Sequence, residues 1–510
     1  MEPDQSEVIA FLSSPGAYAD APETVERMET HGALVFLAGT TVYKIKRAVK
    51  FSYMDLSTLE KRRLMVAREV ALNRQFAPDL YLGAVPIGRA EDGSLRLGGG
   101  VPVEWAVHMR RFDQSALLGR IVGAGKLDSE TAKHTADMVR RMHDHAASHV
   151  CEDADARVGV TVAHLASDLG ACESILGPGR VAAFVAAARD QLGRAGSVLR
   201  RRGLLGHVRR CHGDLHLDNI VLWKGAPVAF DALEFDERLA TIDTLYDLAF
   251  LIMDLVHNDA RADACLVLNR YLWRDPPGIE IDALVALPLF LGLRSAIRAM
   301  VAAQRTLQLE GAERIAKATE ATGFLDDAIA YVTPEPPRLV AVGGRSGTGK
   351  STLAATLAPA LGRAPGALHI RSDLERKAMH GAAETERLPQ SCYTPNVTHA
   401  VYARAMDKAR LALAAGQSVI IDAVFDDPAQ RAGIERIAAR AGARFDGLWL
   451  TADREAMMAR VAARTGDASD ATPAVVAHQL ARDPGHVAWH HVDAGGTVEE
   501  TRAAAKALLD

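Results

Sequence analysis

One ten-residue run constrains the fold of this chain more than any other part of it: Gly343-Gly344-Arg345-Ser346-Gly347-Thr348-Gly349-Lys350-Ser351-Thr352. An apolar stretch, 339–342, precedes it, and a helix-like stretch follows. In this context the backbone N–H groups of a glycine-rich loop converge on phosphate oxygens. Here the loop would hold the phosphates, Lys350 would reach the outer ones and the Ser351 hydroxyl would ligate Mg²⁺. We predict a nucleotide-binding phosphate loop (P-loop) over 344–352.

Three prolines divide the chain in front of this loop. They lie in Val332-Thr333-Pro334-Glu335-Pro336-Pro337-Arg338, which forbids regular structure. Since 510 residues exceed what one core usually covers, we predict three parts. They are a first domain at 1–332, a linker at 333–338 and a P-loop domain at 339–510. Within the first domain, hydrophobic periodicity predicts a small strand-rich lobe at about 25–112 and a helical lobe at about 113–332.

Composition argues against several classes of function. Lys and Arg number 59 against 64 Asp and Glu, so a net charge of −5 gives no electrostatic argument for nucleic acid or an anionic membrane. Five cysteines without C-x-x-C spacing argue against a disulfide framework and fit a reducing cytoplasm. The acidic start lacks the pattern of a signal peptide, and the most apolar windows, 245–256 and 283–293, are too short or are broken by acidic residues. We expect a cytoplasmic protein with no membrane partner.

A second motif lies in the first domain, His212-Gly213-Asp214-Leu215-His216-Leu217-Asp218-Asn219, followed by two short apolar strands that lead to Asp231. Asp214 precedes Asn219 by five positions, and Asp231 lies twelve positions beyond Asn219. This spacing is close to the protein-kinase arrangement of a catalytic base, a metal-binding Asn and a metal-binding Asp. The segment therefore predicts a second phosphotransfer site.

These residues resemble the aminoglycoside phosphotransferase family, in which H-G-D-x-x-x-x-N is usual and the metal-binding Asp lacks the Phe-Gly of protein kinases. Here Ala232-Leu233 follows Asp231, and 242–250 looks like that family's D-x-x-x-D-[IL]-A helix start. The resemblance covers roughly residues 30–260. It implies an α+β bilobal kinase-like fold, with Asp214 accepting the proton of the substrate hydroxyl and with Asn219 and Asp231 holding Mg²⁺.

The small lobe should supply a lysine for the ATP phosphates and a glutamate that holds it. Lys44 and Lys46 lie on one face of a predicted strand, because side chains alternate along a strand. We prefer Lys44, since Val42 two positions earlier suits packing over adenine, and leave Lys46 as a rim charge. Glu69 is the preferred partner and Glu60 the weaker candidate, although either could be a surface residue. The adenine would meet the backbone around Met109.

A zinc site formed by His212, Asp214, His216 and Asp218 is the alternative interpretation of this motif. Residues that alternate along a compact run point in divergent directions unless the loop wraps around the ion. A solvated polar loop, the plainer alternative, leaves the positions of Asn219 and Asp231 unexplained. We therefore favour the phosphotransfer interpretation.

After the P-loop the pattern alternates strands and helices, which indicates an α/β fold with a parallel sheet. The segment 418–422 is an apolar strand that ends in Asp422, suited to organising Mg²⁺ water. The domain resembles small P-loop kinases of the gluconate-kinase and zeta-toxin sort, which implies that Asp373 orients or deprotonates the acceptor hydroxyl. Arg460 and Arg464, four apart on one helix, could close on phosphates or could be solvated.

The sequence thus predicts an α+β bilobal kinase-like fold followed by an α/β P-loop kinase fold, resembling bacterial fusions of an aminoglycoside phosphotransferase with an ATP-binding domain. We expect two Mg·ATP sites that phosphorylate small molecules bearing hydroxyl groups. A nucleotide-sensing P-loop domain that regulates the first domain is one alternative. A nucleic-acid end kinase is another, although aromatic residues make up only 5% of the chain. Four acidic residues could suit a cationic acceptor, but scattered carboxylates are mostly solvated: Asp236, Glu237, Asp254 and Asp259. The acceptors and the oligomeric state stay open.

Overall fold

A computed structural model describes residues 4–30, 32–50 and 54–509. It divides into two compact units, Met1–His149 with Gly206–Leu251, and Val150–Leu205 with Ile252–Asp510. We refer to them as unit 1 and unit 2. The helices of the middle of the chain group with the P-loop region in unit 2, so the boundary at 333–338 stays a prediction.

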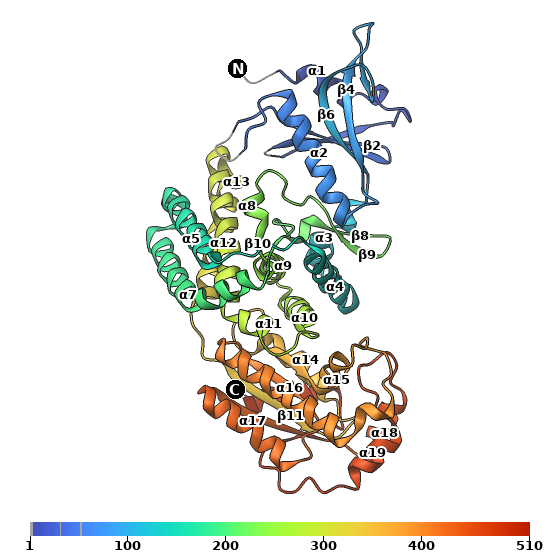
Figure 1. The fold of residues 1–510 in the computed structure, drawn as a ribbon, viewed down its shortest axis with the longest axis vertical. Helices are drawn as coiled ribbons and strands as arrows, with labels where there is room; N and C mark the ends of the chain where they lie inside the picture. Colours follow the sequence, from blue (N-terminus) through green and yellow to red (C-terminus); the bar gives the residue numbers. More distant parts are fainter. Residues whose placement is uncertain (1–3, 31, 51–53, 510) are drawn as a thin grey trace. The chain divides into compact units, whose positions relative to one another are not determined.

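Unit 1 contains a six-stranded antiparallel sheet in the order β1-β2-β3-β6-β4-β5 (Figure 1). The strands are β1 (Val25–Glu29), β2 (Ala33–Ala38), β3 (Thr41–Lys46), β4 (Tyr81–Arg89), β5 (Leu95–Leu97) and β6 (Val101–Arg110). All six strands lie within the strand-rich segment predicted at about 25–112. Four of the five residues of β1 are exposed, and β5 has only three residues.

Helix α2 (Leu59–Phe76) packs on strands β6 and β4. Thr58 caps it, accepting a hydrogen bond from the backbone N–H of Lys61. The buried residues of the helix follow helical spacing, which makes one inward stripe: Arg62, Val66, Glu69, Val70 and Asn73. Polar members of this stripe face the sheet, so α2 delivers functional groups as well as apolar packing.

The rest of unit 1 consists of helices and short strand pairs around the H-G-D segment. The helices are α1 (Ser6–Ser13), α3 (Leu118–Gly123), α4 (Ser129–His145), α8 (Glu237–Ala240) and the first part of α9 (Thr244–His257). Two antiparallel pairs, β7 (Val208–Arg210) with β10 (Thr241–Asp243) and β8 (Ile220–Trp223) with β9 (Ala226–Ala229), flank the motif. The loop-and-strand island expected at 211–231 is therefore present.

The first part of unit 2 is helical: α5 (Ala154–Ala171), α6 (Glu173–Leu176), α7 (Pro178–Leu204), α10 (Arg261–Leu272), α11 (Ile279–Asp282), α12 (Leu287–Arg305) and α13 (Gly311–Val332). Helix α12 packs along α13, and α5 along α7. Among the described residues, no single helix is long and apolar enough to cross a membrane. One pair bent by 57°, Ile279–Val285 with Leu287–Gln308, meets the length and composition of a span.

The last part of unit 2 is a five-stranded sheet in which every neighbouring pair is parallel, in the order β12-β13-β11-β14-β15. The strands are β11 (Arg338–Gly344), β12 (Leu368–Arg371), β13 (Val419–Asp422), β14 (Arg444–Thr451) and β15 (His490–Asp493). The helices are α14 (Lys350–Leu357), α15 (Ser372–Met379), α16 (Pro395–Ala414), α17 (Pro428–Ala441), α18 (Arg454–Ala462), α19 (Pro473–Leu480) and α20 (Val498–Leu509). The predicted fold class is confirmed, whereas β15, α19 and α20 were not predicted.

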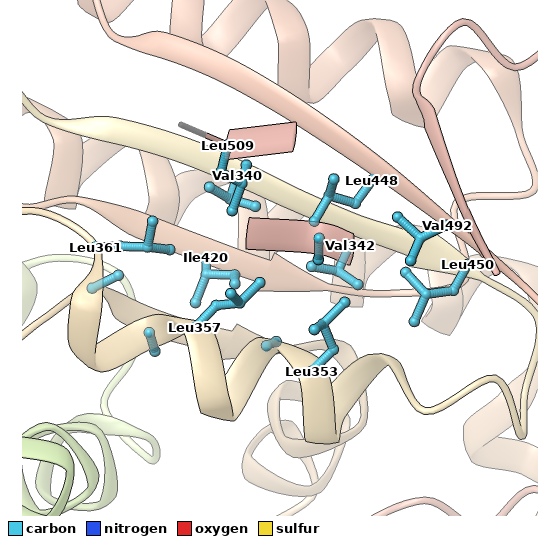
Figure 2. Close-up of a cluster of buried hydrophobic side chains, with 14 of the residues drawn as sticks. Val340, Val342, Leu353, Leu357, Leu361, Ile420, Leu448, Leu450, Val492 and Leu509 are labelled. Atoms are coloured by element: carbon cyan, nitrogen blue, oxygen red, sulfur yellow. The ribbon is translucent and has the colours of Figure 1, made fainter. Parts of the chain in front are cut away.

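Alternate residues of the sheet build two faces. Figure 2 shows Val340, Val342, Ile420, Leu448 and Leu450 gathered with side chains of α14, and these residues belong to one buried cluster. Helix α20 closes the same cluster, while α16 and α17 contact strands from the other side. The strands are therefore buried on both faces, which leaves the carboxyl ends of β11, β12 and β13 to carry the polar groups.

Candidate active sites

The H-G-D loop of unit 1 is held by one buried carboxylate. Asp247 accepts hydrogen bonds from the backbone N–H groups of His212 at 3.2 Å and of Gly213 at 2.8 Å, and His143 Nε2 lies 3.1 Å from it. Gly213 has φ +86°, and a Cβ there would lie 3.1 Å from the Cβ atoms of both Leu233 and Ala240. The glycine that distinguishes this motif from that of protein kinases is therefore required by the backbone.

Asp214 and Asn219 face each other across this loop. Asn219 Nδ2 donates to the backbone oxygen of Asp214 at 2.9 Å and to its carboxylate at 3.1 Å. A short 3₁₀ turn, Leu217–Asn219, brings the Asn219 side chain back to Asp214. The Asp214 side chain is 43% exposed, while Asn219 is buried. The carboxylate of Asp214 is thus partly open to solvent, while the amide of Asn219 is fixed by its hydrogen bonds to Asp214.

Asp231 follows strand β9 in the left-handed region, at φ +60°. Tyr81 and Asn73 fix this conformation, because the Tyr81 hydroxyl accepts from Asp231 N–H at 3.1 Å and Asn73 Oδ1 accepts from Ala232 N–H at 2.8 Å. An aspartate in this region is strained unless its surroundings hold it. Neither Tyr81 nor Asn73 was predicted, although Asn73 lies four residues after Glu69 and so shares its helix face.

Two lysines share Glu69. Lys44 Nζ lies 2.9 Å from Glu69 and 2.6 Å from Asp231, and Lys46 Nζ lies 2.5 Å from Glu69 and 2.5 Å from Glu234. The predicted strand face and the choice of Glu69 agree with this geometry. Glu60 instead pairs with Arg63 at the surface. Lys46 is buried, so its predicted place as a solvated rim charge is wrong.

Burial and charge oppose each other in this network. Burial by itself would lower the pKa of Lys44, but the carboxylates of Asp231 and Glu69 outweigh it and raise that pKa well above its ordinary value. Burial would likewise raise the pKa of Glu69, yet the two lysines hold it well below its usual range. Burial raises the pKa of Glu234. The electrostatic network therefore favours the charged forms of Lys44 and Glu69.

Met109, which the sequence predicts to lie next to the adenine ring, is a residue of strand β6. It pairs with Val42 across strands β6 and β3, as Val107 pairs with Lys44, so Met109 and Val42 share the face of Lys44. Both belong to one buried apolar cluster that continues to Val221, with Phe230 partly buried against it. An apolar surface that leads to a lysine suits a nucleotide base next to its phosphates.

The zinc alternative finds no match in this geometry. Among the described residues, the one group of metal-ligating side chains close enough to share an ion is His143, Cys211 and Asp247, which lies behind the loop. Asp218 is exposed, and His212 Nε2 lies 2.9 Å from the backbone oxygen of Phe230. Of the acidic residues considered for a cationic acceptor in unit 1, Asp236 caps α8, and Glu237 pairs with Arg68 and Arg210.

In unit 2 the P-loop connects strand β11 to helix α14. Gly344 has φ +131° and Gly347 φ +89°, and a Cβ at either would lie 2.5 Å from a backbone oxygen, of Leu450 or Met457. The Ser351 hydroxyl donates to Asp422 Oδ1 at 3.0 Å. The two residues predicted to handle the metal are thus in contact, across seventy-one positions of sequence.

Lys350 has a different setting from Lys44. Its Nζ donates to the backbone oxygen of Arg345 at 2.9 Å. Burial lowers the pKa of Lys350, although the carboxylates of Asp422 and Asp373 act in the other direction. This cation is enclosed by its own loop, whose N–H groups would meet an anion.

Asp373 lies in the first turn of α15, after strand β12. Burial raises the pKa of its carboxyl, opposed by Arg371 and by a hydrogen bond with Ser469, and the Asp422 and Lys350 charges also act on it. Its predicted role toward an acceptor hydroxyl stays a prediction. A raised pKa also suits a group that takes up a proton.

The two predicted lid arginines go to different partners. Arg464 lies 3.3 Å from Asp467, and its charge helps to lower the pKa of Lys350. Arg460 donates to the backbone oxygen of Ala494 at 2.8 Å. Both phosphate roles stay predictions, and the position of Arg464 near Lys350 favours it over Arg460.

Sequence reasoning missed two further residues of the second site. His369 Nε2 lies 2.7 Å from Asp422 Oδ2, and its position two residues before Arg371 on the same strand was the available signal. Gln479 Oε1 accepts from the backbone N–H of Ser346 at 2.8 Å, inside the P-loop. Gln479 comes from α19, a helix that the sequence did not predict, so no signal pointed to it.

Both sites offer the donors that Mg·ATP requires. Hydroxyl, amide and carboxylate oxygens are the ligands that Mg²⁺ prefers, and Asn219 with Asp231 in one site and Ser351 with Asp422 in the other supply them. A Cβ at Gly344 or Gly347 would lie too close to a neighbouring backbone oxygen, so both positions require glycine. Thr348 and Thr352 lie in the same loop and its helix, and the Thr348 hydroxyl donates to Arg345 O at 2.8 Å.

Comparison with known proteins gives the following likenesses. A family model described as an AAA domain matches residues 339–483. A gluconokinase from Sinorhizobium meliloti 1021 has a TM-score of 0.25 at 22% identity, covering 35% of this chain and 93% of its own. The GDP complex of wild-type aminoglycoside 2'-phosphotransferase-IIIa has a TM-score of 0.39 at 14% identity, covering 64% and 99%. At TM-scores this low the two structural likenesses carry no argument about activity.

A relative matches along almost the whole chain. The uncharacterized protein Rv2004c of Mycobacterium tuberculosis (strain ATCC 25618 / H37Rv) is 30% identical over 486 residues, which are 94% of this chain and 94% of that protein. The match spans the kinase-like part, the proline-rich segment and the P-loop part together. This chain belongs to the same family as the mycobacterial protein, and its residues 339–483 match the AAA domain model.

Proposed function

We propose that this protein is an ATP-dependent phosphotransferase with two Mg·ATP sites, each of which phosphorylates a hydroxyl group of a small molecule. One observation carries the proposal. Lys44 Nζ lies 2.9 Å from Glu69 and 2.6 Å from Asp231, and the three residues come from separate segments. In the H-G-D loop, Asp214 accepts a hydrogen bond from Asn219 at 3.1 Å. A solvated polar loop has no need for ion pairs that connect it to a strand and a helix of the small lobe.

In the first site, Asp214 accepts the proton of the acceptor hydroxyl at its partly exposed carboxylate. Asn219 holds that carboxylate in place and, with Asp231, offers oxygen ligands for the metal. Mg·ATP, when bound, supplies the phosphoryl group and neutralises the charge that develops on it. Lys44 would orient the phosphates, and Glu69 keeps Lys44 charged and in position. Val42 and Met109 exclude water from the side of the adenine ring.

In the second site, Lys350 and the P-loop N–H groups bind phosphate oxygens, and Ser351 and Asp422 form the metal side of the pocket. Asp373 orients or deprotonates the acceptor. The raised pKa of Asp373 supports catalysis over mere nucleotide sensing, because a sensor needs no base on the acceptor side.

The direct test is transfer of labelled phosphate from ATP to a panel of sugars, nucleosides and amino alcohols by the full chain. We expect at least one labelled product, formed only with Mg²⁺. The double variant Asp214→Asn/Asp373→Asn is the matched control, since it keeps the shape of both sites and removes both bases. Products that persist in the double variant would show that neither aspartate is a base. A panel without any product but with tight ATP binding would favour the regulatory alternative.

Two other functions are kept as outcomes of the same experiment. If the second module regulates the first, Lys350→Ala should change the rate of the first site although that site still binds ATP. If the protein phosphorylates nucleic-acid ends, an oligonucleotide with a free 5′ hydroxyl should be labelled in preference to the small molecules. The net charge of −5 argues against the second of these.

A further inference from the structure

Helix α10, which precedes the proline-rich segment, is attached to the edge of the P-loop sheet. Strand β12 is an edge strand, so its outer backbone groups need partners. Asn269 Oδ1 accepts from the backbone N–H of His369 at 2.6 Å, and Asn269 Nδ2 donates to the backbone oxygen of Ala367 at 3.2 Å. One carboxamide therefore takes the place of a neighbouring strand.

The attachment also includes the apolar core. Cys265 of α10 is 3% exposed and belongs to the same buried cluster as Leu357, Leu361 and Ala367 of the P-loop domain. Arg261, at the start of the helix, donates to the backbone oxygen of Gly362 at 2.7 Å. Helix α10 is thus packed into the P-loop domain as one of its own elements.

A first route runs from α10 to Asp422, the metal-side carboxylate of the second site. Asn269 fixes the backbone of His369, and the His369 ring lies 2.7 Å from Asp422 Oδ2. The other oxygen of Asp422 accepts from Ser351. Asn269 therefore acts on the carboxylate through a single intervening residue.

A second route starts at the next residue of the helix. Arg270 donates to Glu384 at 2.8 Å, and Glu384 lies 4.0 Å from Arg371. Arg371 Nε lies 3.8 Å from Asp422 Oδ2, and its Nη2 donates to Asp467 at 3.1 Å. The side chains of Arg270, Glu384 and Arg371 are 15 to 17% exposed, so solvent screens these charges little.

The end of α10 is held to the element that carries Asp373. Lys408 donates to the backbone oxygen of Trp273 at 3.0 Å, and Arg404 donates to that of Asp275 at 2.8 Å. Both cations also bind Glu375, which lies two residues after Asp373 on α15. Helix α15, which carries Asp373, is therefore connected through Lys408 and Arg404 to the C-terminal end of α10.

We propose that Asn269 and Arg270 are positioning residues of the second site. They set the orientation of Asp422 and Arg371, so the metal side of the P-loop module is completed by a helix outside residues 339–510. Two adjacent residues that reach one carboxylate by separate routes carry this inference, which rests on the proposed second site. Outer partners of metal-site ligands act by orienting them, and their loss typically lowers metal affinity by about 10-fold or more.

The test measures how much Mg²⁺ strengthens ADP binding in the full chain. Lys44→Ala/Asp231→Ala serves as the parent, because it removes both members of one ion pair and silences the first site. Calorimetry gives the ADP dissociation constant with and without Mg²⁺, and their ratio is the Mg²⁺ enhancement. We expect Arg270→Ala to lower this enhancement by about 10-fold with metal-free ADP affinity unchanged. Arg270→Lys, which keeps the charge, should restore part of it.

Arg274→Ala is the matched control. Its guanidinium lies 4.8 Å from the Trp273 ring, as that of Arg270 lies 5.1 Å from it, so the variant removes a similar stacking contact but no route to Asp422. If Arg270→Ala does not fold, Glu384→Gln removes the charge that links Arg270 to Arg371 and keeps the size of the side chain. It should lower the Mg²⁺ enhancement by the same factor. The inference would be overturned if Arg270→Ala left the Mg²⁺ enhancement unchanged. It would also be overturned if Arg270→Ala weakened metal-free ADP binding as much as it weakened binding with Mg²⁺. A parent that binds no ADP would overturn the proposed second site as well.

Discussion

The two lysines proposed to bind phosphate, Lys44 and Lys350, are both largely enclosed, but their charges are stabilised differently. Lys44 lies between two carboxylates, of Glu69 at 2.9 Å and Asp231 at 2.6 Å, and its pKa is raised. Lys350 contacts a backbone oxygen of its own loop, and burial lowers its pKa. The first cation already has its counter-charges, whereas the second is poised for an anion. Removing Lys44 should therefore lower the stability of the fold, whereas removing Lys350 should mainly abolish nucleotide binding.

The largest expected effect concerns the base of the first site. Asp214→Asn should leave ATP binding nearly intact and lower the rate of phosphate transfer by about 10²-fold or more, because general-base assistance contributes that much. Single-turnover transfer together with ATP titration measures both. Asp218→Asn in the same loop is the control, since Asp218 is exposed. Equal losses in the two variants would remove Asp214 from the base role.

The next effect tests the two lysines directly. Lys44→Ala should lower the free energy of unfolding by about 2 kcal/mol, less than for a fully buried pair because Asp231 is 40% exposed and Lys46 still neutralises Glu69. Lys350→Ala should leave stability nearly unchanged while abolishing nucleotide binding at its site. Urea unfolding without nucleotide measures the two free energies. A larger stability loss for Lys350→Ala would reverse the comparison.

The neighbouring lysine sharpens the same comparison. Lys46 pairs with Glu69 and Glu234, whereas Lys44 pairs with Glu69 and Asp231, so Lys46→Ala should affect transfer less than Lys44→Ala. The transfer rate of the full chain at saturating ATP is the measurement, with Lys350→Ala as the common background. If the two variants lose the same activity, Lys46 and Lys44 act as one unit.

The candidate residues that the sequence alone could indicate are those whose spacing reflects one local element. The H-G-D loop, the P-loop and the strand face of Lys44 follow from local geometry, and Glu69 follows from the helix that faces it. Tyr81, Gln479 and the helix α10 contacts come from segments far away in sequence, and only tertiary packing brings them to the sites. Lys46 was misjudged because the second carboxylate that allows its burial, Glu234, lies 188 positions away.

The pH dependence of stability should have opposite signs in the two sites. The two lysines lower the pKa of Glu69, so its stabilising contribution is present at neutral pH and is lost as pH falls below about 4.3. Burial raises the pKa of Asp373, so its charged form destabilises the fold at neutral pH and its protonated form does not. Glu69→Gln should thus destabilise and Asp373→Asn stabilise at pH 7. The Asp373→Asn difference should shrink toward pH 4, whereas the Glu69→Gln difference should shrink only below about pH 4.3. Urea unfolding at several pH values measures both changes in the free energy of unfolding. If both variants change it in the same direction at pH 7, the account is wrong.

The smallest expected effect concerns the glutamine in the P-loop. Gln479→Ala frees the N–H of Ser346, so ADP affinity at the second site should rise about threefold, the net value of one hydrogen bond. Gln479→Glu should weaken ADP binding, because a carboxylate accepts more strongly and repels phosphates. Calorimetry on both variants brackets the effect. Weaker binding in Gln479→Ala would mean that Gln479 contacts the nucleotide itself.

The number of ATP molecules bound per chain tests the central claim most directly. Titration calorimetry of the full chain with a non-hydrolysable ATP analogue and Mg²⁺ should give two equivalents, since the two lysines belong to separate networks. Lys350→Ala should remove one equivalent, and Asp231→Ala should remove Mg²⁺-dependent binding of the other. One equivalent in the unaltered chain, or loss of both in Lys350→Ala while the chain stays folded, would contradict the account of two independent phosphotransfer sites.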